Sequence, residues 1–132
     1  MVNFNEVDLG KFVSLSIKIF LAMESSCFVL DNETPVINLG AGVSRQILGY
    51  NKDLMMVKVI FAKGATGALH SHVHTQTTYC AEGVFEFRVG DKTEIIKEGD
   101  GLYIPSGMLH GVVCREEGVL IDTFNPVRED FL

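Results

Sequence analysis

Turn-forming residues recur at short intervals along this chain after position 40, and this feature constrains its fold more than any other. Between the turns lie short segments in which apolar and polar residues alternate, a period of two that is typical of β-strands. The expected strands are residues 42–50, 54–62, 68–74, 77–82, 84–89, 93–97, 101–104, 110–115 and 119–124. The expected turns are residues 51–53, 63–64, 82–83, 90–91, 98–100, 105–107 and 116–118. Strands and turns at this density predict an all-β fold, a closed antiparallel β-barrel or jelly roll in one domain.

The length and charge of the chain narrow the choice of partners. A chain of 132 residues is of ordinary size for a single domain. Its formal net charge of −6 at pH 7 disfavours a nonspecific electrostatic attraction to nucleic acid or to an anionic membrane. We therefore expect neither as a partner, and an anionic substrate would need a few placed cations to hold it.

Cysteine usage and the first apolar segment favour a cytoplasmic protein. Cys27, Cys80 and Cys114 form an odd set without paired spacing, which argues for structural thiols in a reducing compartment. The apolar segment 12–23 contains Lys18 and is too short to cross a membrane as a helix. It also lacks the uninterrupted core and small-residue cleavage site of a signal peptide.

Residues 1–31 are expected to form an N-terminal extension ahead of a barrel domain at residues 32–132. Within the extension, residues 12–20 alternate apolar and polar side chains, which predicts an added strand. That strand would pair with an edge of the same sheet or of a partner subunit. Because edge strands of a small barrel need cover, we expect a homodimer. Alternatively, translation begins at Met23, and most of the extension is not part of the natural protein.

Three of the four histidines occupy alternate positions, His70, His72 and His74, and Gln76 follows them. Side chains two apart on a strand point to the same face, so His70 and His72 are suited to bind one metal ion together. Three such residues extend too far along a strand for one ion, so we interpret His74 either as a residue that supports the ligands from behind or as a rim residue in a position to contact substrate. Gln76 can return its amide oxygen to the ion, and His110, which begins an expected strand, supplies a fourth ligand.

The spacing of these residues resembles the two sequence motifs of the cupin family. The first motif is matched by Gly64, His70, His72, Gln76 and Gly83, with Gln76 where Glu is usual. The second is matched by Gly99, Pro105, Gly107 and His110, with Cys114 where Asn is usual. The resemblance implies a β-barrel whose metal is held by His70, His72, Gln76 and His110. The alternative reading of the cluster is a set of packed core histidines.

The neutral amide at Gln76 bears on which metal is bound. Three imidazoles and one amide favour a divalent transition metal (Ni, Zn, Fe, Co, Cu or Mn) over Mg or Ca. No thiolate belongs to the ligand set, and the chain is too short to close every coordination position. We therefore expect an ion that keeps contacts with water or substrate, as a catalytic Lewis acid does.

The segment 119–132, together with residues 42–46, 54–59 and 70–76, is similar to the KdgF family of small pectin-degradation cupins. The resemblance covers roughly residues 32–132. It implies an enzyme that converts 4,5-unsaturated uronate monosaccharides, released from pectin or alginate, to the linear 4-deoxy-5-ketouronate. It therefore implies a small anionic sugar as the substrate.

Three residues near the C-terminus fit that chemistry. Asp122 and Phe124 share a strand face and point into the barrel if the even-numbered register faces the core. We assign Asp122 as the general acid or base that moves protons during hydration of the enol ether carbon and opening of the hemiacetal. Arg128 is expected to hold the uronate carboxylate through two hydrogen bonds, and Phe124 to pack on the sugar ring.

Other readings of these residues remain open at this stage. An Asp at a strand end often caps a turn, and an Arg near a terminus is often a solvated charge. Arg45 and Lys58 lie on expected strands, where they either face inward and neutralise an anionic substrate or remain exposed. Two other functions also fit a metal-binding cupin, a dioxygenase and a non-catalytic sugar-sensing module. Sensing modules are commonly fused to a helical DNA-binding domain, and the sequence pattern predicts no such helical segment here.

Overall fold

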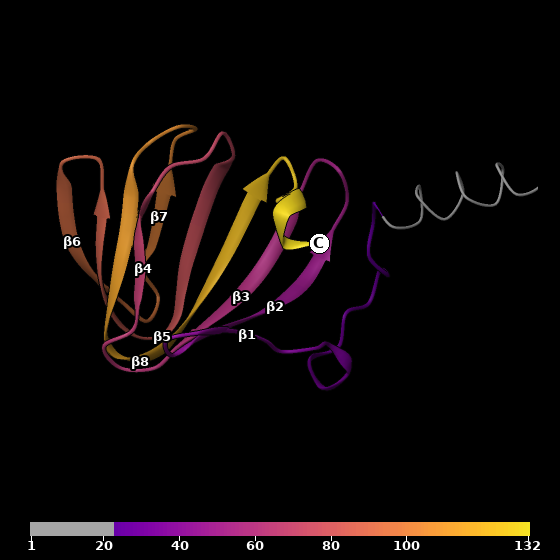
Figure 1. Ribbon diagram of the computed structural model, residues 1–132, viewed down its shortest axis with the longest axis horizontal. Coiled ribbons are helices and arrows are strands. Elements are labelled where there is room, and N and C mark those ends of the chain that lie inside the picture. The colour runs from indigo at the N-terminus through magenta and orange to yellow at the C-terminus, as the bar shows by residue number, and fades with distance from the viewer. Residues whose placement is uncertain (1–22) are drawn as a thin grey trace, which may run out of the picture.

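The computed structural model describes residues 23–132, which form an almost entirely β-sheet structure (Figure 1). The strands are β1 (Ile37–Gly40), β2 (Val43–Tyr50), β3 (Met55–Phe61), β4 (Thr66–His70), β5 (Thr75–Val89), β6 (Lys92–Lys97), β7 (Gly101–Ile104) and β8 (His110–Asn125). Two short 3-10 helices, η1 (Asp31–Glu33) and η2 (Glu129–Phe131), lie at either end of this series. The strand expected at residues 12–20 lies outside the described residues. Within residues 23–132, no helix has the length and apolar character needed to cross a membrane.

All strand pairs are antiparallel, and they form one sheet in the order β1-β2-β3-β8-β5-β6. In addition, β4 pairs with β8 and β7 pairs with β5. The two longest strands, β5 and β8, therefore join β1, β2 and β3 to β4, β6 and β7, which lie on the other side of the molecule (Figure 1). The sheet curls around an apolar interior. The predicted all-β, single-domain fold is confirmed.

The structure corrects the number of strands in the C-terminal half. The expected strands 77–82 and 84–89 both belong to β5, and the expected strands 110–115 and 119–124 both belong to β8. The turns expected at residues 82–83 and 116–118 are therefore wrong. At these positions the two strands remain paired, although the pairing register shifts between Cys80 and Phe85.

Two glycines explain why these positions look like turns in the sequence. A Cβ atom on Gly118 would lie 2.2 Å from the carbonyl oxygen of Glu82, and one on Gly83 would lie 2.6 Å from that of Glu117. Gly83 also has a φ of +91°, in the region that favours glycine. The glycines therefore let β5 and β8 bend and approach each other closely without reversing direction.

The strand expected at residues 68–74 is shorter and earlier than its sequence pattern indicates. It begins at Thr66 and ends at His70, and residues 71–74 connect it to β5. His70 pairs with His110, the first residue of β8. Because β8 has no residue beyond His110 on that side, the ladder ends there. The sequence pattern also did not predict β1, whose four residues are all exposed.

The interior contains two clusters of buried apolar side chains. The larger cluster consists of Phe61, Ala65, Cys80, Phe85, Phe87, Ile96, Ile104, Val112, Cys114 and Leu120. The smaller cluster consists of Met55, Val57, Phe124 and Val127, and Phe131 of η2 packs against it. All three cysteines are free, and burial raises the pKa of the Cys80 and Cys114 thiols, which fits a structural role.

Candidate active site

A cavity of about 260 Å³ lies inside the sheet and is lined by members of both apolar clusters. Its polar and aromatic lining includes His70, Gln76, His110, Asp122, Phe124 and Arg128. These are all but one of the residues that the sequence analysis singled out as ligands or catalytic groups. The remaining one, His72, has its ring centroid 4.8 Å from that of His110. Segments distant in the sequence therefore bring the expected residues together.

His70, His72 and His110 form a compact triad. His70 is the last residue of β4 and His110 the first of β8, and their ring centroids are 4.3 Å apart. His72 reaches the same place from the connection between β4 and β5. One ring nitrogen from each of the three lies within 4.8 Å of the others, so the triad can bind one metal ion.

Backbone hydrogen bonds fix the orientation of all three imidazoles. In each ring, Nδ1 lies 2.7 to 3.0 Å from the carbonyl oxygen of a residue two positions away. A carbonyl oxygen only accepts hydrogen bonds, so each Nδ1 carries the proton and donates it. The lone pair of the neutral ring is then on Nε2. This is the arrangement in which metal-binding histidines are usually held.

The contact between His72 and Gln76 fits a bound cation. His72 Nε2 and Gln76 Oε1 are 3.0 Å apart. With the His72 proton on Nδ1, both atoms are acceptors, and their lone pairs would repel each other without a positive charge between them. One metal ion bound by both atoms would supply that charge. The residues present therefore fit the metal that the sequence motifs imply.

His110 gives a second, independent indication of the same kind. It is only 2% exposed, and its Nε2 atom is buried without a hydrogen-bond partner among the described residues. A buried polar atom without a partner is costly, and a metal ion would remove that cost. Burial and the neighbouring histidines lower the pKa of His110, and burial and the Arg128 charge lower that of His72. Both rings therefore favour the neutral form that binds metals.

A chain of hydrogen bonds links the expected metal ligand Gln76 to Asp122. The Gln76 side-chain amide donates to Thr78 Oγ1 (3.0 Å), and the Thr78 hydroxyl donates to Asp122 Oδ1 (2.6 Å). Because its nitrogen is used in this way, Gln76 directs its oxygen towards His72. Burial raises the pKa of Asp122 to about 6, although the hydrogen bond from Thr78 opposes the shift. A carboxyl group with a pKa near neutrality is suited to move protons.

The even-numbered register expected for the end of β8 is confirmed, because Phe124 is 3% exposed and Asp122 lines the cavity. Arg128 also reaches the cavity, but its Nε and Nη2 atoms donate to the two carboxylate oxygens of Asp130, at 3.0 and 2.8 Å. The guanidinium also lies over the Phe131 ring, 4.2 Å from its centroid. Asp130 therefore already occupies one edge of the Arg128 guanidinium.

Two other residues considered from the sequence have different surroundings. His74 follows the triad in the connection to β5, and its ring is near Phe124, 6.4 Å between centroids. It does not belong to the three-histidine group, and its Nδ1 atom is buried without a hydrogen-bond partner among the described residues, so its role stays a prediction. Lys58 points to the outside of β3 and forms an ion pair with the exposed Asp31 of η1, so it does not reach the cavity.

Sequence reasoning missed Thr78 and Asp130. Thr78 is 3% exposed and lies two positions after Gln76 on the same face of β5. That alternation was the only available signal, and a threonine in a strand is too common to stand out. Asp130 lies two residues after Arg128, and their pairing depends on η2, a turn that the sequence pattern did not indicate.

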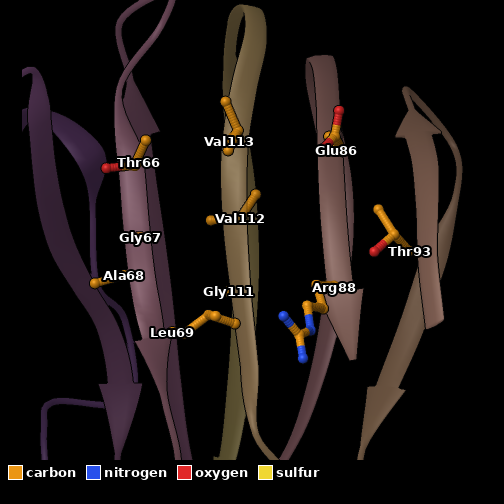
Figure 2. A pocket seen from close by; sticks show the side chains of 10 residues that line it. All are labelled: Thr66, Gly67, Ala68, Leu69, Glu86, Arg88, Thr93, Gly111, Val112 and Val113. Carbon is orange, nitrogen blue, oxygen red and sulfur yellow. The ribbon is translucent and has the colours of Figure 1, made fainter. Parts of the chain in front are cut away.

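A larger cavity, of about 420 Å³, lies on the outer surface of β4, β8, β5 and β6 (Figure 2). Glu86 and Arg88 line it, and they alternate along β5 with the buried Phe85 and Phe87, so it lies on the face away from the core. Figure 2 shows the Arg88 side chain extending from β5 towards Gly111. None of the expected site residues lies there, so the smaller inner cavity is the candidate active site.

A barrel of antiparallel strands with a histidine triad at its cavity defines the cupin class, and comparison with known proteins agrees. Residues 57–124 match the family model described as a cupin domain. The chain belongs to the cupin family and, within it, to the KdgF-like members. It is 49% identical over 107 residues to the pectin degradation protein KdgF of Dickeya dadantii (strain 3937), which covers 80% of this chain and 97% of that protein.

Two solved structures are similar over nearly their whole lengths. A RmlC-like cupin from Shewanella frigidimarina NCIMB 400 is 42% identical with a TM-score of 0.82, covering 83% of this chain and 99% of that one. KdgF from Halomonas sp. is 33% identical with a TM-score of 0.78, covering 82% of this chain and 100% of that one. The likeness therefore includes the barrel and the strands that carry the site.

Proposed function

We propose that this protein is a metal-dependent enzyme that converts 4,5-unsaturated uronate monosaccharides to the linear 4-deoxy-5-ketouronate. The observation that carries the proposal is the presence, in one cavity, of a metal-ready histidine triad and a carboxyl group with a raised pKa. The name of the relative from Dickeya dadantii, a pectin degradation protein, supports a sugar acid from pectin as the substrate.

The cofactor in this proposal is one divalent transition metal ion held by His70, His72, His110 and Gln76. Their orientation by backbone hydrogen bonds and the unpartnered Nε2 of His110 support this ligand set. When bound, the ion supplies Lewis-acid polarisation of a sugar oxygen. Phe124, which is buried beside His72, packs against the sugar ring and excludes water.

Asp122 moves the proton in the proposed reaction. Its ionised carboxylate takes the proton of the hydroxyl on C1, the C1–oxygen bond of the ring breaks, and C1 becomes an aldehyde. The ring oxygen leaves as the enolate on C5. Asp122 then gives the proton to C4, and the enolate becomes the C5 ketone. One O–H bond is lost and one C–H bond is formed, so the reaction is an isomerisation that needs no oxidant or reductant.

Arg128 contributes a positive charge to the lining of the cavity. In the proposal Arg128 binds the uronate carboxylate in one of two ways. Either it uses the edge of its guanidinium that Asp130 leaves free, or the substrate carboxylate replaces Asp130. The net charge of −6 makes such local cations necessary for binding an anion.

The test is an assay of metal-loaded protein on unsaturated galacturonate, followed by the loss of the ultraviolet absorbance of its C4–C5 double bond. Wild-type protein and the control Asp91→Asn, in an exposed turn, should accelerate this loss, and Asp122→Ala with its metal retained should fall to the spontaneous rate. Unchanged turnover in Asp122→Ala would refute the assignment. An oxygen electrode in the same assay distinguishes a dioxygenase, since the proposed isomerisation consumes no oxygen.

We further propose that the enzyme acts in the cytoplasm as a homodimer. The free cysteines support a reducing compartment, and pectin-derived monosaccharides are small enough to be imported. The N-terminal residues ahead of the barrel domain are the part of the chain that we expect to cover a sheet edge across the dimer.

A further inference from the structure

Arg45 is a cation that faces the interior of the barrel. It lies on β2 directly opposite Val59 of β3, which in turn lies opposite Leu120 of β8. Residues opposite each other in a ladder share a face of the sheet, and Leu120 is a core residue that is 2% exposed. The Arg45 side chain therefore points inward, towards the region that the proposed substrate would occupy.

Arg45 forms no ion pair within contact distance among residues 23–132, although the charge of Asp130 acts on it from farther away. Its Nε atom is buried without a hydrogen-bond partner, and no carboxylate of the described residues forms an ion pair with it. Two other cations of the same part of the chain differ in this respect, since Lys58 pairs with Asp31 and Arg115 with Glu86. An inward charge without a partner is costly, and a bound anion would remove that cost.

Arg45 also contacts a residue that lines the site cavity. Its guanidinium carbon is 3.8 Å from the centroid of the Phe131 ring, and that of Arg128 is 4.2 Å from the same centroid. Phe131 and Arg128 both line the cavity that contains the histidine triad. Two cations thus share one aromatic ring. Asp130 forms an ion pair with Arg128 and acts on Arg45 from farther away, so one carboxylate serves two cations beside the cavity.

We propose that Arg45 is a specificity-determining residue that, with Arg128, binds the carboxylate of a sugar acid and so selects uronic acids over neutral sugars. The inference deepens the proposed function and rests on it for the identity of the substrate. Asp130 already occupies one edge of the Arg128 fork, whereas the donors of Arg45 have no protein partner in the described structure. A planar guanidinium with free donors matches a carboxylate through two parallel hydrogen bonds.

The experiment compares two probes that differ only at C6, galacturonate with a carboxylate and galactose with a hydroxymethyl group, by calorimetric titration of metal-loaded protein. The variants are Arg45→Met, Arg45→Lys and the control Arg115→Met, whose guanidinium is half exposed and paired on the outside of the sheet. We expect wild type and Arg115→Met to prefer galacturonate, and Arg45→Met to lose that preference by about 10- to 100-fold. Arg45→Lys should retain part of the preference for galacturonate, because the positive charge remains but the planar guanidinium with its parallel donors is lost.

A purely structural role for Arg45, holding Phe131 in place, would weaken the binding of both sugars equally. That result would overturn the proposal, as would an unchanged galacturonate preference in Arg45→Met. If Arg45→Met does not fold, titration of the wild-type protein with the two sugars still tests the proposal. A wild-type protein that does not prefer galacturonate to galactose would contradict an anion site. In the turnover assay, Arg45→Met should raise KM for unsaturated galacturonate far more than it lowers kcat.

The two proposals can fail separately. Titration with galacturonate requires no turnover, so a wild-type protein that binds it selectively but converts no unsaturated uronate would support the anion site and refute the reaction. Conversely, full turnover with the same KM in Arg45→Met and wild type would leave the reaction intact and refute the role of Arg45.

Discussion

Thr78 and Asp122 lie directly opposite each other on β5 and β8, and the Thr78 hydroxyl donates a 2.6 Å hydrogen bond to Asp122 Oδ1. This bond stabilises the ionised carboxylate and opposes the effect of burial on its pKa. The same hydroxyl accepts from Gln76, so one side chain connects the expected metal ligand to the proton-transfer group.

Replacing Thr78 by Val keeps the shape of the side chain and removes the hydroxyl. The pKa of Asp122 should then rise by about one unit, because a hydrogen bond to a charged group stabilises it by roughly 1.5–3 kcal/mol. Since the proposed reaction uses ionised Asp122, the acidic limb of the pH–kcat/KM profile, expected near pH 6, should move to higher pH. The control is Thr77→Val, on the exposed face of β5. If the acidic limb of the profile stays at the same pH in Thr78→Val, the proposed effect of the Thr78 hydrogen bond on Asp122 is contradicted.

The raised pKa of Asp122 also predicts how its replacement affects stability. A carboxyl group with a pKa raised from 3.8 to about 6 binds its proton more tightly in the folded state than in the unfolded state. Its contribution to the free energy of unfolding is therefore fully present below about pH 4 and is lost as the pH rises through 6. Asp122→Asn cannot ionise and escapes this loss.

Compared with wild type, Asp122→Asn should therefore gain about 1–3 kcal/mol in the free energy of unfolding between pH 4 and pH 8. Urea denaturation of metal-free protein at the two pH values measures the difference. A difference between variant and wild type that does not change with pH would show that burial does not raise the pKa of this carboxyl group.

The sequence was sufficient for the fold class, because alternation is a local signal, and the resemblance to the cupin motifs implied that the expected site residues converge. His110, for example, begins a strand as expected, and the alternation of Asp122 with Phe124 gave the correct face of β8. The number of strands was wrong at Gly83 and Gly118. A glycine that lets two paired strands approach each other closely has the same local sequence pattern as a glycine that makes a turn. The pairing of Arg128 with Asp130 depends on the path of η2, which is set by tertiary packing on Phe124.

The close approach of β5 and β8 predicts a large effect of a single methyl group. Gly118→Ala would place a Cβ atom 2.2 Å from the carbonyl oxygen of Glu82, so the backbone must move, and we expect a loss of more than about 2 kcal/mol in stability. The control is Gly101→Ala, whose Cβ atom would lie 3.4 Å from the nearest atom, and it should cost less than about 1 kcal/mol. Equal stability of the two variants in urea would contradict the close approach of β5 and β8 at Gly118.

The proposed homodimer can be tested by light scattering. The full chain, of 14.5 kDa, should give about twice its own mass, and a version that begins at Met23 should give a smaller mass if the preceding residues cover the sheet edge of a partner. A monomer in both cases would remove this role for the N-terminal extension. A dimer in both would place the interface within residues 23–132.

The most direct test of the account is the metal content of purified protein, measured by elemental analysis after loading with a divalent transition metal and exhaustive dialysis. We predict one ion per chain in wild type and in His74→Ala, and a metal affinity lowered by about 10- to 100-fold or more in Gln76→Ala and His110→Ala. A wild-type protein that retains no metal, or a His110→Ala variant that retains as much as wild type, would contradict the central claim.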